Sequence, residues 1–330
     1  MSDHFVKYIN IDRYKCFHDF SAEGFGRVNL ISGRNNVGKT ALMEALFVNV
    51  DTENSQTLIK SLGVVDFFRN KTDRIYSIVG VPENLKGGDG EVQLISNVNS
   101  ILYNSDDSDV LMSYEISVNG QVTTISESSI RKVIQEIFNS SFTHSCYISS
   151  GRDTQAGIIS SFTAIQKKDR ELDVYRIIKG FDDSIESVKV IGGDSIECKV
   201  INAAGESSYR NIREFGDGLR HYVSIIADLF RSENSYLFID ELDNGIHYSS
   251  LDQLWEIILT LSKELNVQVF ATTHSIECIE SYCRVAEKLK EKDITFTTLV
   301  KNKENAVKAI IRDYEVFTDS IHDNREVRGW

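Results

Sequence analysis

The chain has 330 residues, of which 41% are hydrophobic and 26% charged, a balance that is ordinary for a globular protein with a sizeable buried core. Its formal net charge of -13 argues against gripping nucleic acid by bulk electrostatics, because phosphate contacts need clustered Lys and Arg. No apolar run is long enough for a secretory signal or a membrane span, and the cysteines are scattered, so we expect a reduced cytoplasmic chain with no membrane contact.

The first half of the chain reads mostly as strands. FVKYINI and RVNLIS, residues 5–11 and 27–32, are rich in β-branched and apolar residues, and a helix is expected over 39–49. Residues 91–126 are again strand-like, and Asn119-Gly120 between two alternating runs is a strong hairpin signal. A loop is expected around Pro82 and 87–90, and a helix over 128–138.

The second half alternates between helices and strands. The expected strands cover 187–193, 195–202, 235–240, 267–273, 294–300 and 306–313, the first two forming a hairpin around Gly192-Gly193-Asp194. The expected helices cover 171–181 and 251–265, with further helices after Gly218 and from Ser275. Strand–helix alternation in the last third predicts a parallel sheet with helices against it, and the middle of the chain reads as an inserted α+β region.

A phosphate-binding loop lies between the strand at 27–32 and the helix at 39–49. GRNNVGKT matches G-x-x-x-x-G-K-[ST] in full, and its residues are Gly33, Arg34, Asn35, Asn36, Val37, Gly38, Lys39 and Thr40. The glycines let backbone N–H groups turn inward around a β-phosphate, at the positive end of the following helix. Lys39, expected in an exposed loop, would span the β- and γ-phosphates, and the Thr40 hydroxyl would ligate Mg²⁺. The sequence therefore predicts a nucleotide site.

Two later strands end in residues suited to hydrolysis. YLFIDE is an apolar strand ending in Asp240 and Glu241, which could hold the Mg²⁺ shell and orient the attacking water. The same sequence is also typical of a structural core strand followed by a solvent-exposed acidic turn without a catalytic role. His274 ends the strand VFATTH, where a γ-phosphate sensor would be placed, although a lone histidine is more often structural. Gly216 and Gly218 open a helix whose N-terminus suits a second phosphate.

The order of these motifs resembles the ABC-type ATPases of the RecF/SMC/OLD branch, and FGDGLR followed by FIDELDNGIH is most similar to stand-alone OLD-like ATPases of prokaryotic defence systems. The resemblance implies an α/β P-loop NTPase of ABC-ATPase head type, with a mixed sheet core. It makes residues 33–40 the Walker A motif, Asp240 and Glu241 the end of Walker B, and His274 the switch histidine. The turn at Gly216 and Gly218 stands at the signature position, without the signature serine.

One ABC-type ATPase domain is therefore expected, with residues 1–60 and 206–330 as its nucleotide-binding core and 61–205 as an insert. The resemblance implies an ATP-hydrolysing switch that dimerises head to tail, each Walker A closed by the partner's glycine turn. We expect substitution of Gly218 by Asp to block this closure while leaving each protomer's own Walker A competent, so that nucleotide binds almost normally but is hydrolysed little.

The stretch after His274 is too short for the Toprim nuclease of OLD proteins, so a separate nuclease or toxin chain is expected as the effector, in anti-phage or foreign-DNA defence. The alternative is a RecF-like repair ATPase that binds duplex DNA directly, which the net charge does not favour. A scaffold that holds nucleotide with little turnover agrees less well with the acidic pair. A transporter ATPase agrees less well with the altered glycine turn.

Overall fold

The computed structural model describes residues 5–70, 91–96, 98–106, 113–126, 145–150, 155–193, 195–201 and 205–327. The chain divides into two compact units, the first made of Met1–Ser145 with Ile294–Trp330 and the second of Cys146–Asp293. The expected helix over 128–138 and the expected loop at Pro82 and 87–90 lie outside the described residues. Among those described, no helix is long and apolar enough to cross a bilayer.

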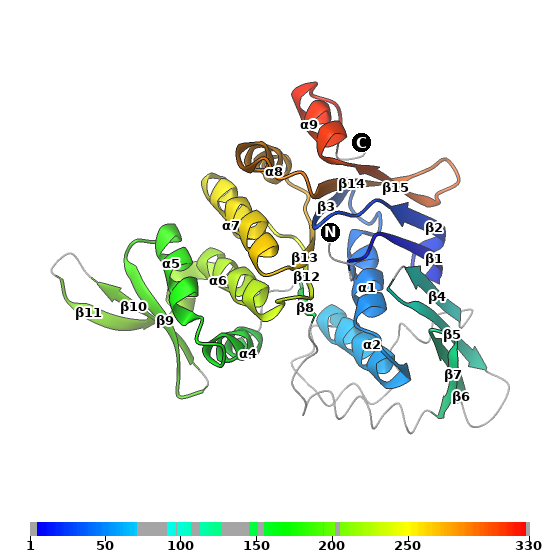
Figure 1. The fold of residues 1–330 in the computed structure, drawn as a ribbon, viewed down its shortest axis with the longest axis horizontal. Coiled ribbons are helices and arrows are strands. Elements are labelled where there is room, and N and C mark those ends of the chain that lie inside the picture. Colours follow the sequence, from blue (N-terminus) through cyan, green and yellow to red (C-terminus); the bar gives the residue numbers. More distant parts are fainter. Residues whose placement is uncertain are drawn as a thin grey trace. The chain divides into compact units, whose positions relative to one another are not determined.

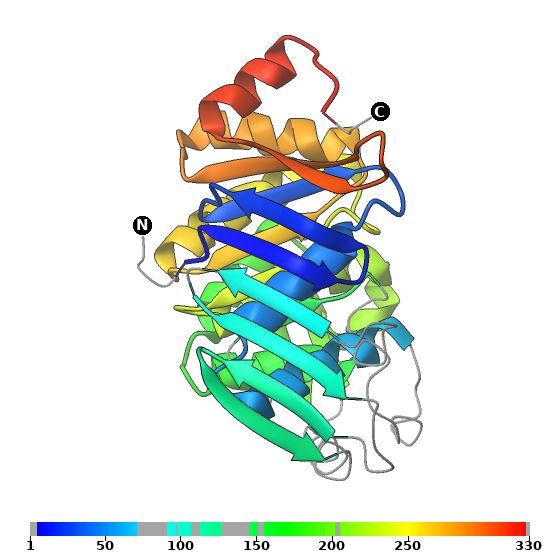
Figure 2. The ribbon, with the colours of Figure 1, turned by 90° about the vertical axis from the view of Figure 1, so that its right-hand side faces the viewer.

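An antiparallel sheet of six strands, in the order β2-β1-β4-β5-β6-β7, forms a large part of the first unit (Figure 2). Its strands are β1 (Tyr8–Tyr14), β2 (Phe17–Glu23), β4 (Glu91–Ser96), β5 (Ser100–Asp106), β6 (Ser113–Val118) and β7 (Gln121–Ser126). Asn119 and Gly120 form the β6–β7 turn with φ of 52° and 80°. Asn and Gly tolerate this left-handed backbone best, which is why their order identified the hairpin, and the prediction is confirmed.

The phosphate-binding loop belongs to a second layer of the first unit. Strand β3 (Val28–Gly33) runs parallel to β14 (Ile294–Lys301), which pairs antiparallel with β15 (Val307–Arg312), so the sheet is mixed. Helix α1 (Lys39–Val50) packs against β1 and β4 and is buried over residues 41–49. Helices α2 (Ser55–Asn70) and α9 (Tyr314–His322) complete the unit.

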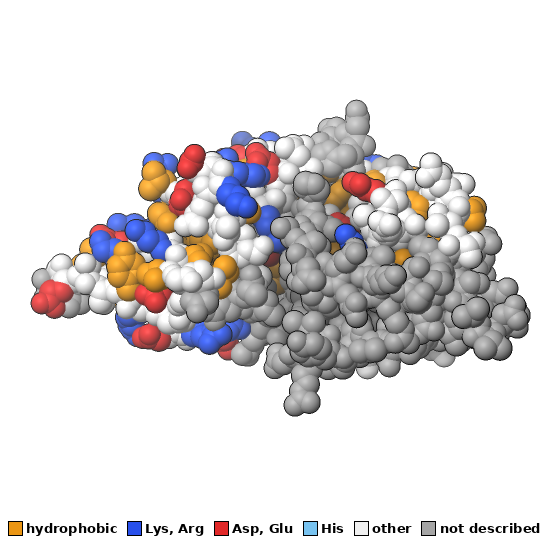
Figure 3. All heavy atoms as spheres, turned by 90° about the horizontal axis from the view of Figure 1, so that it is seen from below, with side chains coloured by type: hydrophobic (Ala, Val, Ile, Leu, Met, Phe, Trp, Pro, Cys, Tyr) orange, Lys and Arg blue, Asp and Glu red, His pale blue; other side chains and the backbone are white. Residues whose placement is uncertain are grey.

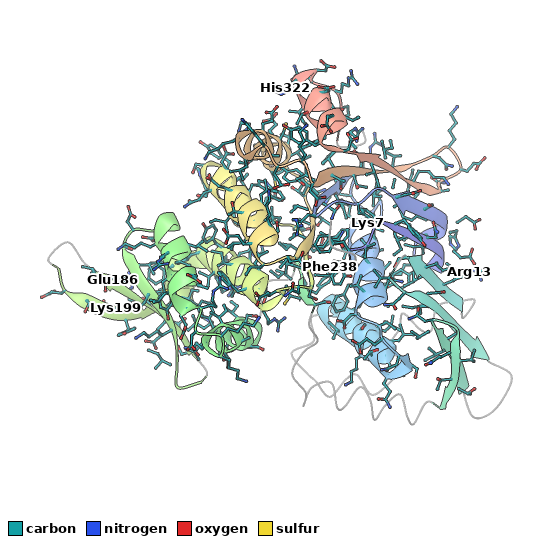
Figure 4. All side chains as sticks on the ribbon, in the orientation of Figure 1. Lys7, Arg13, Glu186, Lys199, Phe238 and His322 are labelled. Atoms are coloured by element: carbon teal, nitrogen blue, oxygen red, sulfur yellow. The ribbon has the colours of Figure 1, made fainter. Side chains whose placement is uncertain are left out.

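The second unit is built on a short parallel layer. Strand β12 (Tyr236–Ile239) runs parallel to both β8 (Cys146–Ile148) and β13 (Gln268–Thr272). Every residue of β12 and β13 is buried, and the ring of Phe238 (labelled in Figure 4) stacks on Phe270 with centroids 5.4 Å apart. Strands buried on both faces read as continuous apolar runs, and the predicted parallel sheet is confirmed.

Helices cover this parallel layer, with α6 packed against α4 and α7, and α7 packed against α8 (Figure 1). They are α4 (Gln155–Gln166), α5 (Glu171–Phe181), α6 (Gly216–Arg231), α7 (Leu251–Glu264) and α8 (Ile276–Leu289). Ser275 is the N-cap of α8, its hydroxyl accepting a hydrogen bond from Cys278 N at 3.0 Å. This confirms the helix predicted to begin at Ser275.

A small antiparallel sheet, β9 (Ile185–Ile191), β10 (Ser195–Ile201) and β11 (Ser207–Asn211), completes the second unit. Gly192 and Gly193 turn the β9–β10 hairpin with φ of 65° and 81°, as predicted. Glu186 and Lys199 pair across these two strands at 2.7 Å (Figure 4). The expected division into a core of 1–60 and 206–330 with an insert of 61–205 is a functional one, and it stays a prediction.

Candidate nucleotide site

The loop of residues 33–40 joins the fully buried strand β3 to helix α1. Its two glycines are required by the packing as well as by the backbone. Gly33 has φ of 153°, and a Cβ there would lie 2.7 Å from the carbonyl oxygen of Leu299. Gly38 has φ of 114°, and a Cβ there would lie 2.7 Å from Cys16 Sγ. Any side chain would therefore push the loop away from its neighbours.

The Lys39 ammonium lies inside the curl of this loop. Its Nζ donates hydrogen bonds of 3.0 Å to the carbonyl oxygens of Gly33 and Arg34, and the residue is only 6% exposed. The expectation that Lys39 lies in an exposed loop was wrong, because the loop folds back over the side chain and the residue already belongs to α1. The carbonyl oxygens of the loop thus hold the positive charge of Lys39 at the position where the loop would bind an anion.

The middle of the loop faces outward. Arg34, Asn35 and Asn36 are exposed, whereas Val37 is buried and Thr40 is half-buried. A hollow in the first unit is lined by residues 34–37 on one side and 299–302 with Asn305 on the other. Its rim carries a guanidinium, an ammonium and several amides, groups that donate hydrogen bonds to anionic ligands.

A turn between β1 and β2 is fastened to the same loop. Lys15 Nζ forms an ion pair of 2.5 Å with Glu44 Oε2 on α1, where the Glu44 side chain is only 3% exposed. The neighbouring Cys16 contacts the loop at Gly38, and Phe17 also lies against that glycine. A largely buried pair of this kind is sensitive to loss of one partner, since the other charge would stay buried.

The acidic pair lies at the end of β12 in the second unit. Asp240 is buried, its backbone N–H donates to Ile148 O at 2.8 Å, and its Oδ1 accepts from Thr272 Oγ1 at 2.6 Å. Glu241 follows with a left-handed φ of 55°, and its N–H donates to the same Thr272 hydroxyl at 2.8 Å. Thr272 therefore orients the carboxylate of one residue and the backbone of the next.

The turn after the acidic pair is tied to the strand that carries His274. Thr273 Oγ1 donates to Asp243 Oδ1 at 2.6 Å and also accepts from Ser275 N at 3.0 Å. His274 lies between Thr273 and Ser275, two residues after the end of β13, and is exposed. The structure thus places His274 on the loop next to the acidic turn, with its neighbours fixed by hydrogen bonds.

The glycine turn begins α6 after a short 3-10 helix, Ile212–Phe215. Asn211 caps that helix in a reciprocal box with Glu214, and Arg210 beside Glu214 lowers the pKa of its carboxyl. Gly216 has φ of 83° with open space around a Cβ position. The exposed, capped turn leaves the start of α6 accessible to another molecule.

The structure brings the predicted site residues together in two groups, one in each unit. The loop of residues 33–40 forms the first group; the second contains Gly216, Gly218, Asp240, Glu241 and His274. A polar hollow in the second unit is lined by Asp240, by the residues that follow β8, by the first turns of α6 and by the turn after the acidic pair: Ser149, Ser150, Asp217, Arg220, His221, Asn244 and Gly245. The catalytic and binding roles of these residues stay predictions.

Sequence reasoning overlooked three side chains that shape the second group. Thr272 and Thr273 directly precede His274, and two hydroxyls at the end of a buried strand could have been read as partners for nearby carboxylates. His221 in α6 lies with Nε2 3.2 Å from the carbonyl oxygen of Leu242. A partner 21 residues away leaves no local signal in the sequence.

Comparisons with known proteins bear on the type of activity. A family model described as "AAA domain, putative AbiEii toxin, Type IV TA system" matches residues 126–280, which include the acidic pair, His274 and the glycine turn. A Helicobacter pylori protein named ATP/GTP phosphatase is 24% identical over 353 residues, covering 89% of this chain and 90% of its own.

Two solved structures cover nearly the whole chain. An SMC head bound to the C-winged helix domain of ScpA matches with a TM-score of 0.52 at 12% identity, over 94% of this chain and 98% of its own. The SMC head domain from Thermotoga maritima matches with a TM-score of 0.46 at 13% identity, over 92% and 98%. The first of these matches shows that the chain has the fold of an ABC-ATPase head. The family model and the Helicobacter pylori relative support nucleotide hydrolysis.

Proposed function

We propose that this chain is an ATP-binding and ATP-hydrolysing switch subunit of the stand-alone OLD-like kind, whose head-to-tail dimer forms when nucleotide binds. The observation that carries the proposal is the loop of residues 33–40. It combines two glycines of left-handed φ with the buried Lys39 ammonium, held at 3.0 Å by loop carbonyls at the start of a helix. Such a loop binds the phosphates of a nucleotide.

In this proposal each group has a defined task. Lys39 and the N–H groups of the loop bind the phosphates, and Glu241 accepts a proton from the attacking water. His274 contacts the γ-phosphate from the loop after β13. Gly216 and Gly218 present backbone N–H groups to the nucleotide of the partner protomer.

Thr40 and Asp240 are the proposed Mg²⁺ ligands. A hydroxyl and a carboxylate are the hard oxygen donors that Mg²⁺ prefers, and the Asp240 carboxylate is buried and oriented by Thr272. When bound, Mg²⁺ would neutralise charge that develops on the phosphates. Thr272 keeps Asp240 in place by donating to Oδ1.

The proposed effector is a separate nuclease or toxin chain, in defence against phage or foreign DNA. The description of the matching family places it in a Type IV toxin–antitoxin system, and the similar SMC head was solved with a domain of ScpA bound. The bound domain supports a chain that acts through a partner.

Direct binding of duplex DNA is favoured less by the surface of the second unit. Figure 3 shows Lys, Arg, Asp and Glu side chains intermixed there. Four basic side chains are paired with carboxylates at 2.7–2.8 Å: Lys168 with Glu233, Lys199 with Glu186, Arg284 with Asp252 and Lys288 with Glu256. Duplex binding that weakens steeply with salt would instead support the RecF-like alternative.

The direct test measures phosphate release from ATP and from GTP by the purified chain with Mg²⁺, together with its mass by light scattering. We expect hydrolysis, and a doubled mass when ATP is present. A chain that binds no nucleotide would overturn the proposal. A chain that hydrolyses ATP as a monomer under all conditions would overturn its dimer switch.

A further inference from the structure

The turn that carries Glu241 is held on one side by hydrogen bonds that it donates to Thr272, the last residue of β13. Glu241 N donates to Thr272 Oγ1 at 2.8 Å, and Leu242 N donates to Thr272 O at 2.9 Å. Glu241 has a left-handed φ of 55°, which a non-glycine residue adopts only where its surroundings enforce it. The direction of its carboxylate therefore depends on the contacts that fix this turn.

Helix α6 holds the same turn from another side. His221 Nε2 lies 3.2 Å from the carbonyl oxygen of Leu242, the residue directly after Glu241. A carbonyl oxygen only accepts, so Nε2 carries the hydrogen and donates it. The Leu242 side chain is fully buried, which makes this peptide a fixed point of the turn.

The same helix begins at the glycine turn. His221 lies one helical turn after Gly218, and a Cβ on Gly218 would lie 2.5 Å from the carbonyl oxygen of Gly245. The start of α6 is thus packed without space against the turn that follows the acidic pair. If Gly216 or Gly218 moved, the Glu241 turn would also move, because the packing against Gly245 and the hydrogen bond of His221 connect them.

We propose that His221 is a positioning residue: its hydrogen bond to Leu242 O sets the direction of the Glu241 carboxylate and links it to the glycine turn at the start of α6. This inference rests on the proposed ATPase function, in which Glu241 is the base. A partner protomer that closes on the glycine turn would then also place the base of the protomer that supplies this turn.

The experiment compares His221→Gln with His221→Met. These side chains have similar length and volume, but only Gln can donate a hydrogen bond to Leu242 O. We expect the Met variant to lose about 10- to 100-fold in kcat with an unchanged Kd for ATP, since misplacing a catalytic group by about 1 Å can cost this much. The Gln variant should recover most of the loss.

Two further variants make the result specific. His322→Ala, at the end of α9 (labelled in Figure 4), removes a histidine from the other unit and should change neither constant. His221→Met added to Glu241→Gln should cause little further loss, because two residues that act through one step are not additive.

Equal kcat for the Gln, Met and parent proteins would overturn the positioning role. So would a full additional loss in the Glu241→Gln background, because His221 would then act independently of the base. Absence of ATP hydrolysis in the parent protein would instead overturn the proposed function, so the two failures can be told apart.

Discussion

The carbonyl oxygen of Gly245 lies 2.5 Å from the position that a Cβ on Gly218 would occupy. This contact joins the first turn of α6 to the turn that follows the acidic pair, within one protomer. Gly218 has an ordinary helical backbone, so its glycine identity is explained by space and not by φ. An Asp at this position would therefore also strain the protomer that carries it, and the predicted competence of that protomer's own Walker A stays a prediction.

Gly218→Ala separates helix propensity from packing. In an open helix the change would stabilise the protein by up to about 1 kcal/mol. Here the new methyl meets a backbone carbonyl at 2.5 Å, and overpacking of this kind costs about 1–3 kcal/mol. We expect packing to dominate, giving a lower denaturation midpoint in urea. A midpoint equal to or above that of the parent protein would show that the two turns separate easily.

Lys39→Ala removes the charge at the centre of the phosphate loop. Loss of a charge-assisted contact to a phosphate, at about 1.5–3 kcal/mol, predicts a nucleotide Kd about 10- to 100-fold higher. Titration with a fluorescent ATP analogue measures this directly. Lys60→Ala on α2 is the matched control and should bind like the parent protein. Parent-like affinity in the Lys39 variant would remove the residue from the site.

Glu241→Gln keeps the shape of the side chain but cannot accept a proton from water. We expect ATP to bind normally and kcat to fall by about 10²–10⁴-fold, the usual effect of losing a general base. The variant should persist as a dimer with ATP, which light scattering would show as a doubled mass. Glu264→Gln, on an exposed position of α7, serves as the control. Normal turnover in a monomeric variant would exclude Glu241 as the base.

The phosphate loop and the β6–β7 hairpin could be predicted because their determinants are local. Left-handed backbone is found at Gly33 and Gly38, which have the fixed spacing of the motif, and at Asn119 beside Gly120. These residue types favour that conformation, so the sequence alone predicts it. The strand before Asp240 could also be predicted, because its four residues form an apolar run. The structure buries all four of them.

The remainder depends on partners that are distant in sequence. Thr272 orients Asp240 from 32 residues away, and Lys39 is buried because the loop carbonyls fold over it. Helix α2 was not predicted, because Gly63 and the β-branched pair Val64 and Val65 after it weaken its helical pattern. The orientation of Asp240, the burial of Lys39 and the helix α2 depend on tertiary contacts, which the local spacing of residues does not predict.

Cys16 offers a probe of the phosphate loop that needs no engineered residue. It is exposed, whereas the other four cysteines are buried. Burial raises the pKa of Cys146 and Cys198 to about 12 and that of Cys283 to about 11, and it also raises the pKa of Cys278. These four thiols stay protonated and shielded at ordinary assay pH, so a thiol reagent should reach only Cys16 in the folded protein.

A maleimide should therefore label the native chain once, and Mg²⁺-ATP should slow the labelling. The reason is the contact with the loop: a Cβ on Gly38 would lie 2.7 Å from Cys16 Sγ, so a nucleotide bound against the loop restricts approach to the sulfur. In turn, the labelled protein should bind ATP weakly, because the adduct presses on Gly38. Mass spectrometry counts the adducts, and Cys16→Ser should take up none in the folded state. Labelling at one rate with and without Mg²⁺-ATP would mean that the β1–β2 turn does not respond to the nucleotide.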